Sequence, residues 1–500
     1  MTLTIWQQRM AHRWQRFAPQ LRYHAVPLYL VLVATLIGQL TTLVGHPFIL
    51  TTPDSPTYIN FAQRIMHGHW FDNQRTPVYP ALLAVAAALF GTHQLGAVIS
   101  IQIGLTVAAI YEIYVLVWRL CERRWMAALV ASAVGLNLFM LQWERFILTE
   151  CLTFWEAVTL FVLFERYLRT QRWGYFVGIT VLCILSIFTR PSNVFLPLIL
   201  FTVLGMWQLV HRVSWQRWAA CVLALTFMYS LVGLYAHGNG TQTGYYGLSI
   251  IGDVNLFGKV LEYHMQNEWS DPRNAPLGSA VSAYAQQGGI DPYVYLRTHG
   301  YSYQLYLQLG PYDHDVISHH LGEYAVKSLP DIGRTLTAPA YFDTGAKLPK
   351  AQFLAKVGQL PLALNLFLPL LAMLLGIGMV WRFRLDRHFI LLGLLLVALS
   401  NVVLTGVGSY AELYRLRAPF DWAMLLATVV ILVELGMALR GQRSVLFRFG
   451  KILSQKKSDA LLPVPDQATQ LLPIVASKIS TSTIDASSMP TMRPPSVDEK

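Results

Sequence analysis

The sequence predicts an all-α polytopic membrane protein with about ten transmembrane helices. Three observations predict this class. Of the 500 residues, 54% are hydrophobic and only 13% are charged, whereas about a quarter of the residues in a soluble domain are charged. Apolar runs of about 20 residues recur along the chain, and a helix of that length crosses a bilayer. Basic residues gather between these runs, so topology explains the net charge of +11 better than nucleic-acid binding does.

The expected elements follow in order. The first span is retained as a helix, because it lacks a small-residue cleavage site. The predicted spans are 26–44, 95–118, 125–141, 146–168, 174–188, a sixth that ends at 210, 218–235, 357–381, 389–407 and 420–439. The resulting regions are a cytoplasmic N-terminus (1–25), a core (26–235) with a first external loop (45–94), an external section (236–356), C-terminal spans (357–440) and a cytoplasmic tail expected to be disordered (441–500).

Arginine-capped turns decide the expected orientation. They lie near 119–124, 166–172, 212–217 and 382–387. Because these turns alternate with the others, the positive-inside rule places them and both termini in the cytoplasm. The opposite face of a plasma (inner) membrane then receives the unusual polar residues, which lie in the first external loop, at 144–150, at Arg190, in 236–356 and at 412–417.

The stretch from Thr52 to Ala84 organises the rest of the chain. It holds Asp54 between two prolines, then a short amphipathic piece, then Arg75 before a proline-rich turn. The apolar run 78–90 is too short to cross, so we expect an interfacial helix there. An acid and an arginine held beside a bilayer predict a site for a charged group on a lipid.

Asp54 has two interpretations, which the sequence leaves even. An aspartate before Ser-Pro is a good helix N-cap, and that role alone would explain the residue. The alternative is a general base, or an acid that orients an acceptor, at the bilayer surface.

Three arginines on the same predicted face are candidates for binding phosphate. Arg190 interrupts two apolar runs, so it either snorkels to headgroups or binds phosphate through its forked guanidinium, and we favour the second role. Arg415 and Arg417 are similar, and Glu412 is placed to orient either one.

Acids near and inside the spans are further candidates. Glu150 stands at a helix entrance beside an apolar run. Glu156 and Glu112 lie inside spans, where an acid is costly unless a polar partner such as Asn137 satisfies it. The four cysteines imply no disulfide framework, and we expect no metal or cofactor. The residues considered and set aside as metal ligands, because their spacing fits no strong zinc motif, are His67, His69, Asp313, His314, Asp315, His319 and His320.

Several of these motifs together resemble a known family. The segments Asp54-Ser55-Pro56-Thr57-Tyr58 and 75–84 resemble the first external loop of GT-C membrane glycosyltransferases, and the pattern is most similar to bacterial protein O-mannosyltransferase-like enzymes and lipid A aminoarabinose transferases. Leu148-Thr149-Glu150, Thr189-Arg190-Pro191 and the turn 414–419 resemble later parts of the same family pattern. The resemblance covers about 26–439, and the section 236–356 matches least.

The resemblance implies an inverting transfer of a sugar from a polyprenyl-phosphate donor to an extracytoplasmic acceptor, which is a protein, a lipid or a cell-envelope glycan. It implies Asp54 as the catalytic carboxylate, which takes the proton from the acceptor, and the chain has Ser55 where many members have a second acid, which disfavours a metal-dependent variant. The implied phosphate-binding residues are Arg75, Arg190, Arg415 and Arg417. The implied orienting residues are Tyr58, Tyr79, Glu150 and Glu412.

Two other functions stay open at this stage. A flippase for lipid-linked glycans also needs arginines near phosphate, but it should present polar residues through the whole membrane depth. An inactive scaffold subunit related to the GT-C enzymes fits the same motifs. The expected partners are the lipid-linked donor, the acceptor and membrane lipid, without nucleic acid.

Overall fold

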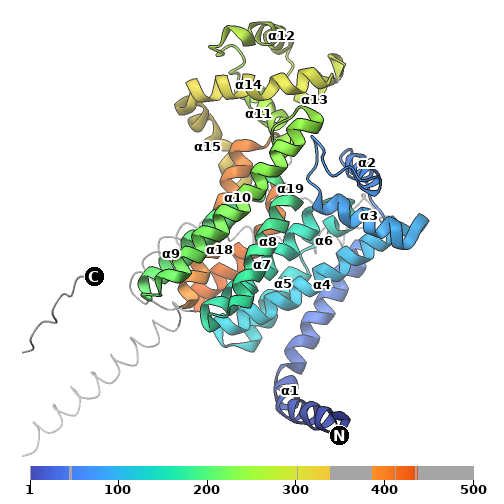
Figure 1. Cartoon of the computed structure of the whole chain (residues 1–500), viewed down its shortest axis with the longest axis vertical. Helices are drawn as coiled ribbons and strands as arrows, with labels where there is room; N and C mark the ends of the chain where they lie inside the picture. The colour runs from blue at the N-terminus through green and yellow to red at the C-terminus, as the bar shows by residue number, and fades with distance from the viewer. Residues whose placement is uncertain are drawn as a thin grey trace, which may run out of the picture. The chain divides into compact units, whose positions relative to one another are not determined.

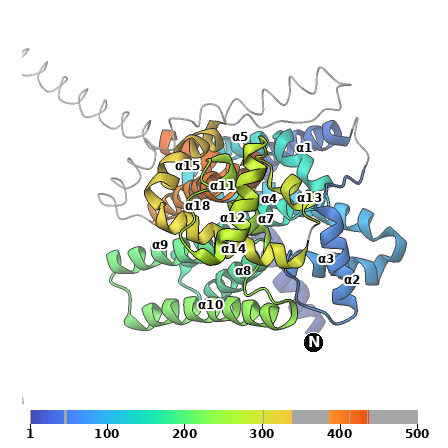
Figure 2. The ribbon, with the colours of Figure 1, turned by 90° about the horizontal axis from the view of Figure 1, so that it is seen from above.

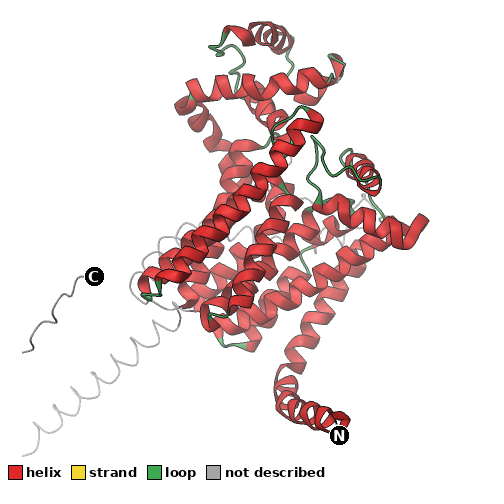
Figure 3. Ribbon diagram, viewed as in Figure 1, coloured by secondary structure: helices red, strands yellow, loops and turns green. Residues whose placement is uncertain are grey.

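The computed structural model describes residues 2–43, 48–300, 302–337, 386–411, 413–433 and 436, with the backbone alone for 2–22. This part of the chain is helical (Figure 3). Its one β-bridge joins Leu50 to Phe146. The predicted span 357–381 and the tail 441–500 lie outside the described residues. The all-α class predicted from the sequence is confirmed.

The described residues form a multi-pass membrane protein with six helices long and apolar enough to cross a bilayer. These are Tyr23–Leu43, Val78–Cys121, Pro191–Val210, Trp215–Thr243, Asp386–Gly408 and Leu413–Val433. A seventh arises if Arg124–Gly135 and Leu138–Arg145, bent by 48°, count as one span. The count of ten is not confirmed, because Trp173–Thr189 is shorter than a full span and Glu150–Thr170 carries charged residues along its length.

The bundle is built from helices that pack through their apolar faces (Figures 1 and 2). Its elements are α1 (Thr2–Leu43), α4 (Gln94–Cys121), α5 (Arg124–Gly135), α6 (Leu138–Gln142), α7 (Glu150–Thr170), α8 (Trp173–Thr189), α9 (Leu196–Val210), α10 (Trp215–Thr243) and α18 (Asp386–Gly408). Helices α1 and α5 cross where two glycines meet, since a Cβ on Gly38 would come within 2.2 Å of the Gly135 carbonyl oxygen. Small residues allow this close approach of two membrane helices.

Two short helices form the first loop, at the places that the sequence predicts. They are α2 (Ser55–Met66) and α3 (Val78–Phe90). Tyr58 and Phe61 of α2 belong to the same buried apolar cluster as Tyr79 and Leu83 of α3. The loop is tied to the bundle because the Leu50 amide donates to the Arg145 carbonyl at 2.9 Å.

The section after α10 is helical and has an apolar core of its own. Its elements are α11 (Ile251–Glu262), α12 (Ala275–Gln286), α13 (Pro292–Thr298), α14 (Tyr303–His319) and α15 (Leu321–Thr337). Figure 1 shows α11 to α14 beyond one end of the long helices, while α15 packs against α18. Phe257, Tyr295 and Tyr312 are fully buried there, so a stretch that is hydrophilic on average still folds around aromatic side chains.

Candidate active site

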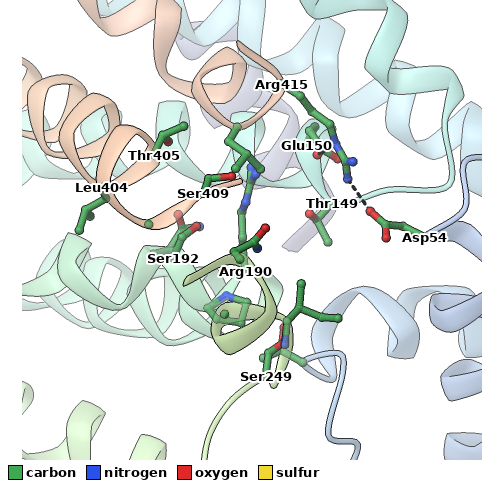
Figure 4. Close-up of a pocket in the computed structure, with 18 of the residues that line it drawn as sticks. Asp54, Thr149, Glu150, Arg190, Ser192, Ser249, Leu404, Thr405, Ser409 and Arg415 are labelled. Atoms are coloured by element: carbon green, nitrogen blue, oxygen red, sulfur yellow. Dashed lines mark hydrogen bonds and ion pairs between the residues drawn. The ribbon is translucent and has the colours of Figure 1, made fainter. Parts of the chain in front are cut away.

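A cavity of about 770 Å³ opens where the first loop, the break between α8 and α9, one face of α18 and the ends of α11 and α13 meet. Figure 4 shows Asp54, Glu150, Arg190 and Arg415 at this cavity. These four residues come from distant parts of the sequence. The fold therefore gathers most of the candidate charged residues at one site.

Asp54 is held between two arginines. Its Oδ1 accepts from Nη2 of Arg75 at 2.8 Å, and its Oδ2 accepts from Nη2 of Arg415 at 3.1 Å. Asp54 is the residue before α2, but its side chain makes no capping hydrogen bond. Of the two interpretations, the side-chain cap therefore does not describe this carboxylate.

The electrostatics of Asp54 follow from these contacts. Burial by itself raises the pKa of the carboxyl group, but Arg75 and Arg415 outweigh burial, so the pKa lies below its ordinary value. Asp54 is consequently ionised at neutral pH. Its side chain is 36% exposed and faces the cavity, whereas that of Arg415 is 7% exposed.

Arg75 is a supporting residue for Asp54. Its Nε donates to the Thr57 hydroxyl at 2.7 Å, and its guanidinium lies 4.4 Å from the centre of the Tyr58 ring. Tyr58 packs edge-on against Tyr79, whose hydroxyl donates to Gln102 at 2.7 Å. Tyr79 is fully buried and stands behind the lining, so of the two predicted tyrosines only Tyr58 reaches the cavity.

Glu150 fixes the other arginine. It is buried in the first turn of α7, and its Oε1 accepts from Nε of Arg415 at 2.7 Å. Arg415 thus bridges two carboxylates, Glu150 on one side and Asp54 on the other. A guanidinium held through Nε keeps its planar fork oriented towards the cavity.

Arg190 occupies the break between α8 and α9. Pro191 follows it, and Arg190 has an extended backbone with φ −148° and ψ 119°, as expected for a residue before proline. The preceding Thr189 donates to Oε1 of Glu156 at 2.6 Å. Thr189, not Asn137, is therefore the partner that Glu156 finds, and Asn137 instead caps α6.

The cavity lining has a small positive charge. Its charged residues are Asp54, Arg75, Glu150, Arg190, Asp291, Arg297 and Arg415. These four arginines and three acids give a formal charge of +1. The lining also contains Phe195, Leu196, Val397, Leu404 and Phe420, so one cavity offers both a charged part and an apolar part.

Of the predicted residues that the structure describes, Tyr79 and Arg417 do not line this cavity. Arg417 is absent from the lining, since it binds Asp421 at 2.8 Å and donates to the carbonyl of Thr335 near the end of α15. Glu412 lies outside the described residues. Arg415 and Arg417 both belong to α19 (Leu413–Arg417), but only Arg415 lines the cavity, whereas Arg417 contacts Asp421 and the end of α15.

One group in the described residues has ligand atoms close enough to hold a metal ion. It consists of Glu268, His320 and Glu323, and none of them lines the cavity. Lys327 already pairs with Glu323 at 2.6 Å. Of the histidines considered in the sequence, this group includes His320 alone.

Sequence reasoning missed the residues that α18 and α13 contribute. Asn401 and Thr405 of α18 line the cavity, as do Tyr293 and Arg297 of α13. A signal for α18 was present, because two polar residues four apart lie on one helix face inside an apolar run. The residues of α13 gave no such signal, since they are polar residues in a polar section.

No protein-family model and no curated protein matches the sequence. Two structures of the oligosaccharyltransferase of Archaeoglobus fulgidus are similar to this chain with TM-scores of 0.43 and 0.44, at 15% and 14% identity, over 83% and 84% of this chain. The chain spans about half of these proteins, 51% and 52% of their length. ArnT of Cupriavidus metallidurans, bound to undecaprenyl phosphate, matches with a TM-score of 0.32 and 12% identity, over 82% of this chain and 78% of that one.

Proposed function

We propose that the protein is an integral membrane glycosyltransferase that moves a sugar from a polyprenyl-phosphate donor to a hydroxyl or amine acceptor. The observation that carries the proposal is that Arg190, Arg415 and the carboxylate of Asp54 line one cavity, which is also apolar in part, and that Arg415 contacts Asp54 there. A lipid-linked sugar has the matching parts, namely an apolar tail, a phosphate and an electrophilic carbon.

The charge of the cavity supports a donor with a single phosphate. A sugar joined to a lipid through one phosphate is a phosphodiester with one negative charge, and the formal charge of the lining is +1. Arg190 and Arg415 bind the phosphate oxygens, because guanidinium groups match phosphate geometry. The phosphate is the leaving group, so these arginines stabilise the charge that develops on it in the transition state.

Asp54 takes the proton from the acceptor in this mechanism. The acceptor oxygen or nitrogen forms a bond to the anomeric carbon, the bond from that carbon to the phosphate oxygen breaks, and the proton passes to the carboxylate. A one-step displacement of this kind inverts the anomeric centre. The phosphate also competes with Asp54 for Nη2 of Arg415, and losing that contact makes the carboxylate a stronger base once the donor is bound.

The proposed location follows from the positive-inside rule. The cavity lies on the extracytoplasmic face of the plasma (inner) membrane, and the acceptor arrives from that side past α13. The external section then forms the wall that the acceptor meets.

The test is release of polyprenyl phosphate. Purified protein in lipid nanodiscs is given a panel of undecaprenyl-phosphate sugars with candidate acceptors, and free undecaprenyl phosphate is measured. We expect release with at least one pair, and loss of release in Asp54→Asn. Movement of intact lipid-linked sugar across vesicles without any release would instead favour the flippase.

A further inference from the structure

The face of α18 that borders the cavity has no role in the mechanism above. Among the candidate spans α18 is the most apolar, yet Asn401 and Thr405 interrupt it on the side that lines the cavity. Asn401 lies about 10 Å along the helix from Gly408, at a rise of about 1.5 Å per residue. A polar side chain at that depth of a membrane helix indicates a partner or a function.

In the part of the chain that the structure describes, Oδ1 of Asn401 has no partner that would explain it structurally. This oxygen is buried as well. The adjacent Ser400 differs, because its hydroxyl donates to the Val397 carbonyl of the same helix at 2.9 Å. A buried acceptor without a donor is costly, so Asn401 calls for a ligand that brings a hydrogen-bond donor into the cavity.

Only one part of the proposed donor can meet that need. A phosphodiester has acceptor oxygens but no N–H or O–H group, and an isoprenoid tail has neither. The sugar has hydroxyl groups and, in amino sugars, an amine. Resting on the proposed function, we propose that Oδ1 of Asn401 accepts a hydrogen bond from a hydroxyl or amino group of the donor sugar and makes Asn401 a sugar-recognition residue.

The arrangement of the cavity is compatible with this contact. In Figure 4 Arg190 lies between Asp54 on one side and Ser192, Leu404 and Thr405 on the other. A sugar whose phosphate is at Arg190 can therefore turn its anomeric carbon towards Asp54 and another edge towards α18. Asn401 then contributes to the choice of sugar, while the arginines recognise any lipid phosphate.

The test compares the effect of each variant on two probes that share the lipid and the phosphate group, one with the sugar and one without it. Binding of undecaprenyl phosphate and of a panel of undecaprenyl-phosphate hexoses and amino sugars is measured in nanodiscs. We expect Asn401→Ala to weaken the best sugar-bearing probe about ten-fold and to leave plain undecaprenyl phosphate within about two-fold. Arg190→Ala should weaken both probes, and Ser400→Ala, whose hydroxyl is satisfied within the helix, neither.

Asn401→Leu is the second variant, because leucine fills the asparagine volume and suits a membrane helix. It should produce the same split between the probes. Equal weakening of both probes, or of neither, by the two Asn401 variants would overturn the sugar contact while leaving the proposed function in place. Wild-type protein that binds neither probe would contradict the proposed function and this inference together.

Discussion

Two buried networks of charged residues differ in one respect, which is access to a cavity. Around Asp54, two arginines and Glu150 meet in a cavity, and the Asp54 carboxylate is 36% exposed to it. Around Lys259 of α11, the ammonium contacts Asp331 of α15 at 2.5 Å, and each side chain is only 1% exposed. The second network is as ionic as the first, but neither Lys259 nor Asp331 lines the cavity.

The comparison separates structural charges from those available to a substrate. Asp331 also accepts from the Tyr263 hydroxyl at 2.7 Å, so the closed network joins α11 to α15 and holds the section together. In the proposed mechanism, Arg415 exchanges Asp54 for a phosphate, while Asp54 keeps its contact with Arg75 and Arg415 keeps its contact with Glu150. A buried ion pair is therefore weak evidence of a site by itself, and becomes informative when one member faces a cavity.

The largest expected effect is a fall in turnover when Asp54, in the network that faces the cavity, is substituted. Asp54→Asn keeps the shape of the side chain but not its basicity, so turnover should fall about a hundred- to ten-thousand-fold while donor binding persists. Single-turnover transfer measured beside donor binding tests this. Near-normal transfer by the asparagine variant would leave Asp54 a structural role and remove the residue-level support for the mechanism.

Substitutions in the closed network around Lys259 and Asp331 should lower the stability of the protein and leave transfer activity unchanged. Lys259→Met leaves Asp331 buried, with the Tyr263 hydroxyl at 2.7 Å and the exposed guanidinium of Arg334 at 3.0 Å but without its buried cation, so we expect a loss of about 3 kcal/mol in the free energy of unfolding. Denaturant titration in micelles measures this loss. Lys259→Met combined with Asp331→Leu should recover much of it, because an apolar pair can replace a buried ion pair. Loss of transfer activity in the folded fraction would contradict the division between the two networks.

The sequence predicted the local parts of the fold well. The bounds of α3 at 78–90 follow from an apolar run between Pro77 and Gly91. Asp54 and Arg75 were found as candidates because both lie in the polar stretch between the first span and this run, and their proposed roles stay predictions. The number of spans was harder to predict, since Glu150–Thr170 combines an apolar composition with charges that are satisfied only inside the bundle.

Sequence reasoning missed some cavity residues because it does not show which way a helix is turned in the bundle. Whether Asn401 faces lipid or a cavity is decided by how α18 packs against α7, α9 and α15, which hydropathy does not encode. The direction of the Arg417 side chain could not be predicted either, because the packing of neighbouring elements sets the orientation of the five-residue helix α19.

A smaller effect is expected in the pH dependence of transfer. Because the pKa of Asp54 is lowered, its carboxylate stays ionised, and its contribution to stability is present above about pH 4 and is lost as the pH falls through the folded-state pKa. Arg75→Met removes one of the two cations, so the acidic limb of kcat/KM for the acceptor should move to higher pH by about one unit. Arg75→Lys, which keeps the charge, should move it less. An unchanged limb in Arg75→Met would assign that titration to another group.

The smallest effect is expected from two lysine substitutions at neighbouring arginines. Arg415→Lys keeps the charge but loses the planar fork that reaches both Asp54 and Glu150, so donor KM should rise about ten-fold. Arg417→Lys acts outside the cavity, on Asp421 and the end of α15, and should lower stability by about 1 kcal/mol with donor KM unchanged. Kinetics and denaturant titration on both variants separate the two roles. Equal rises in donor KM would place Arg417 in phosphate binding after all, because a contact confined to Asp421 and α15 gives no reason for a change in donor affinity.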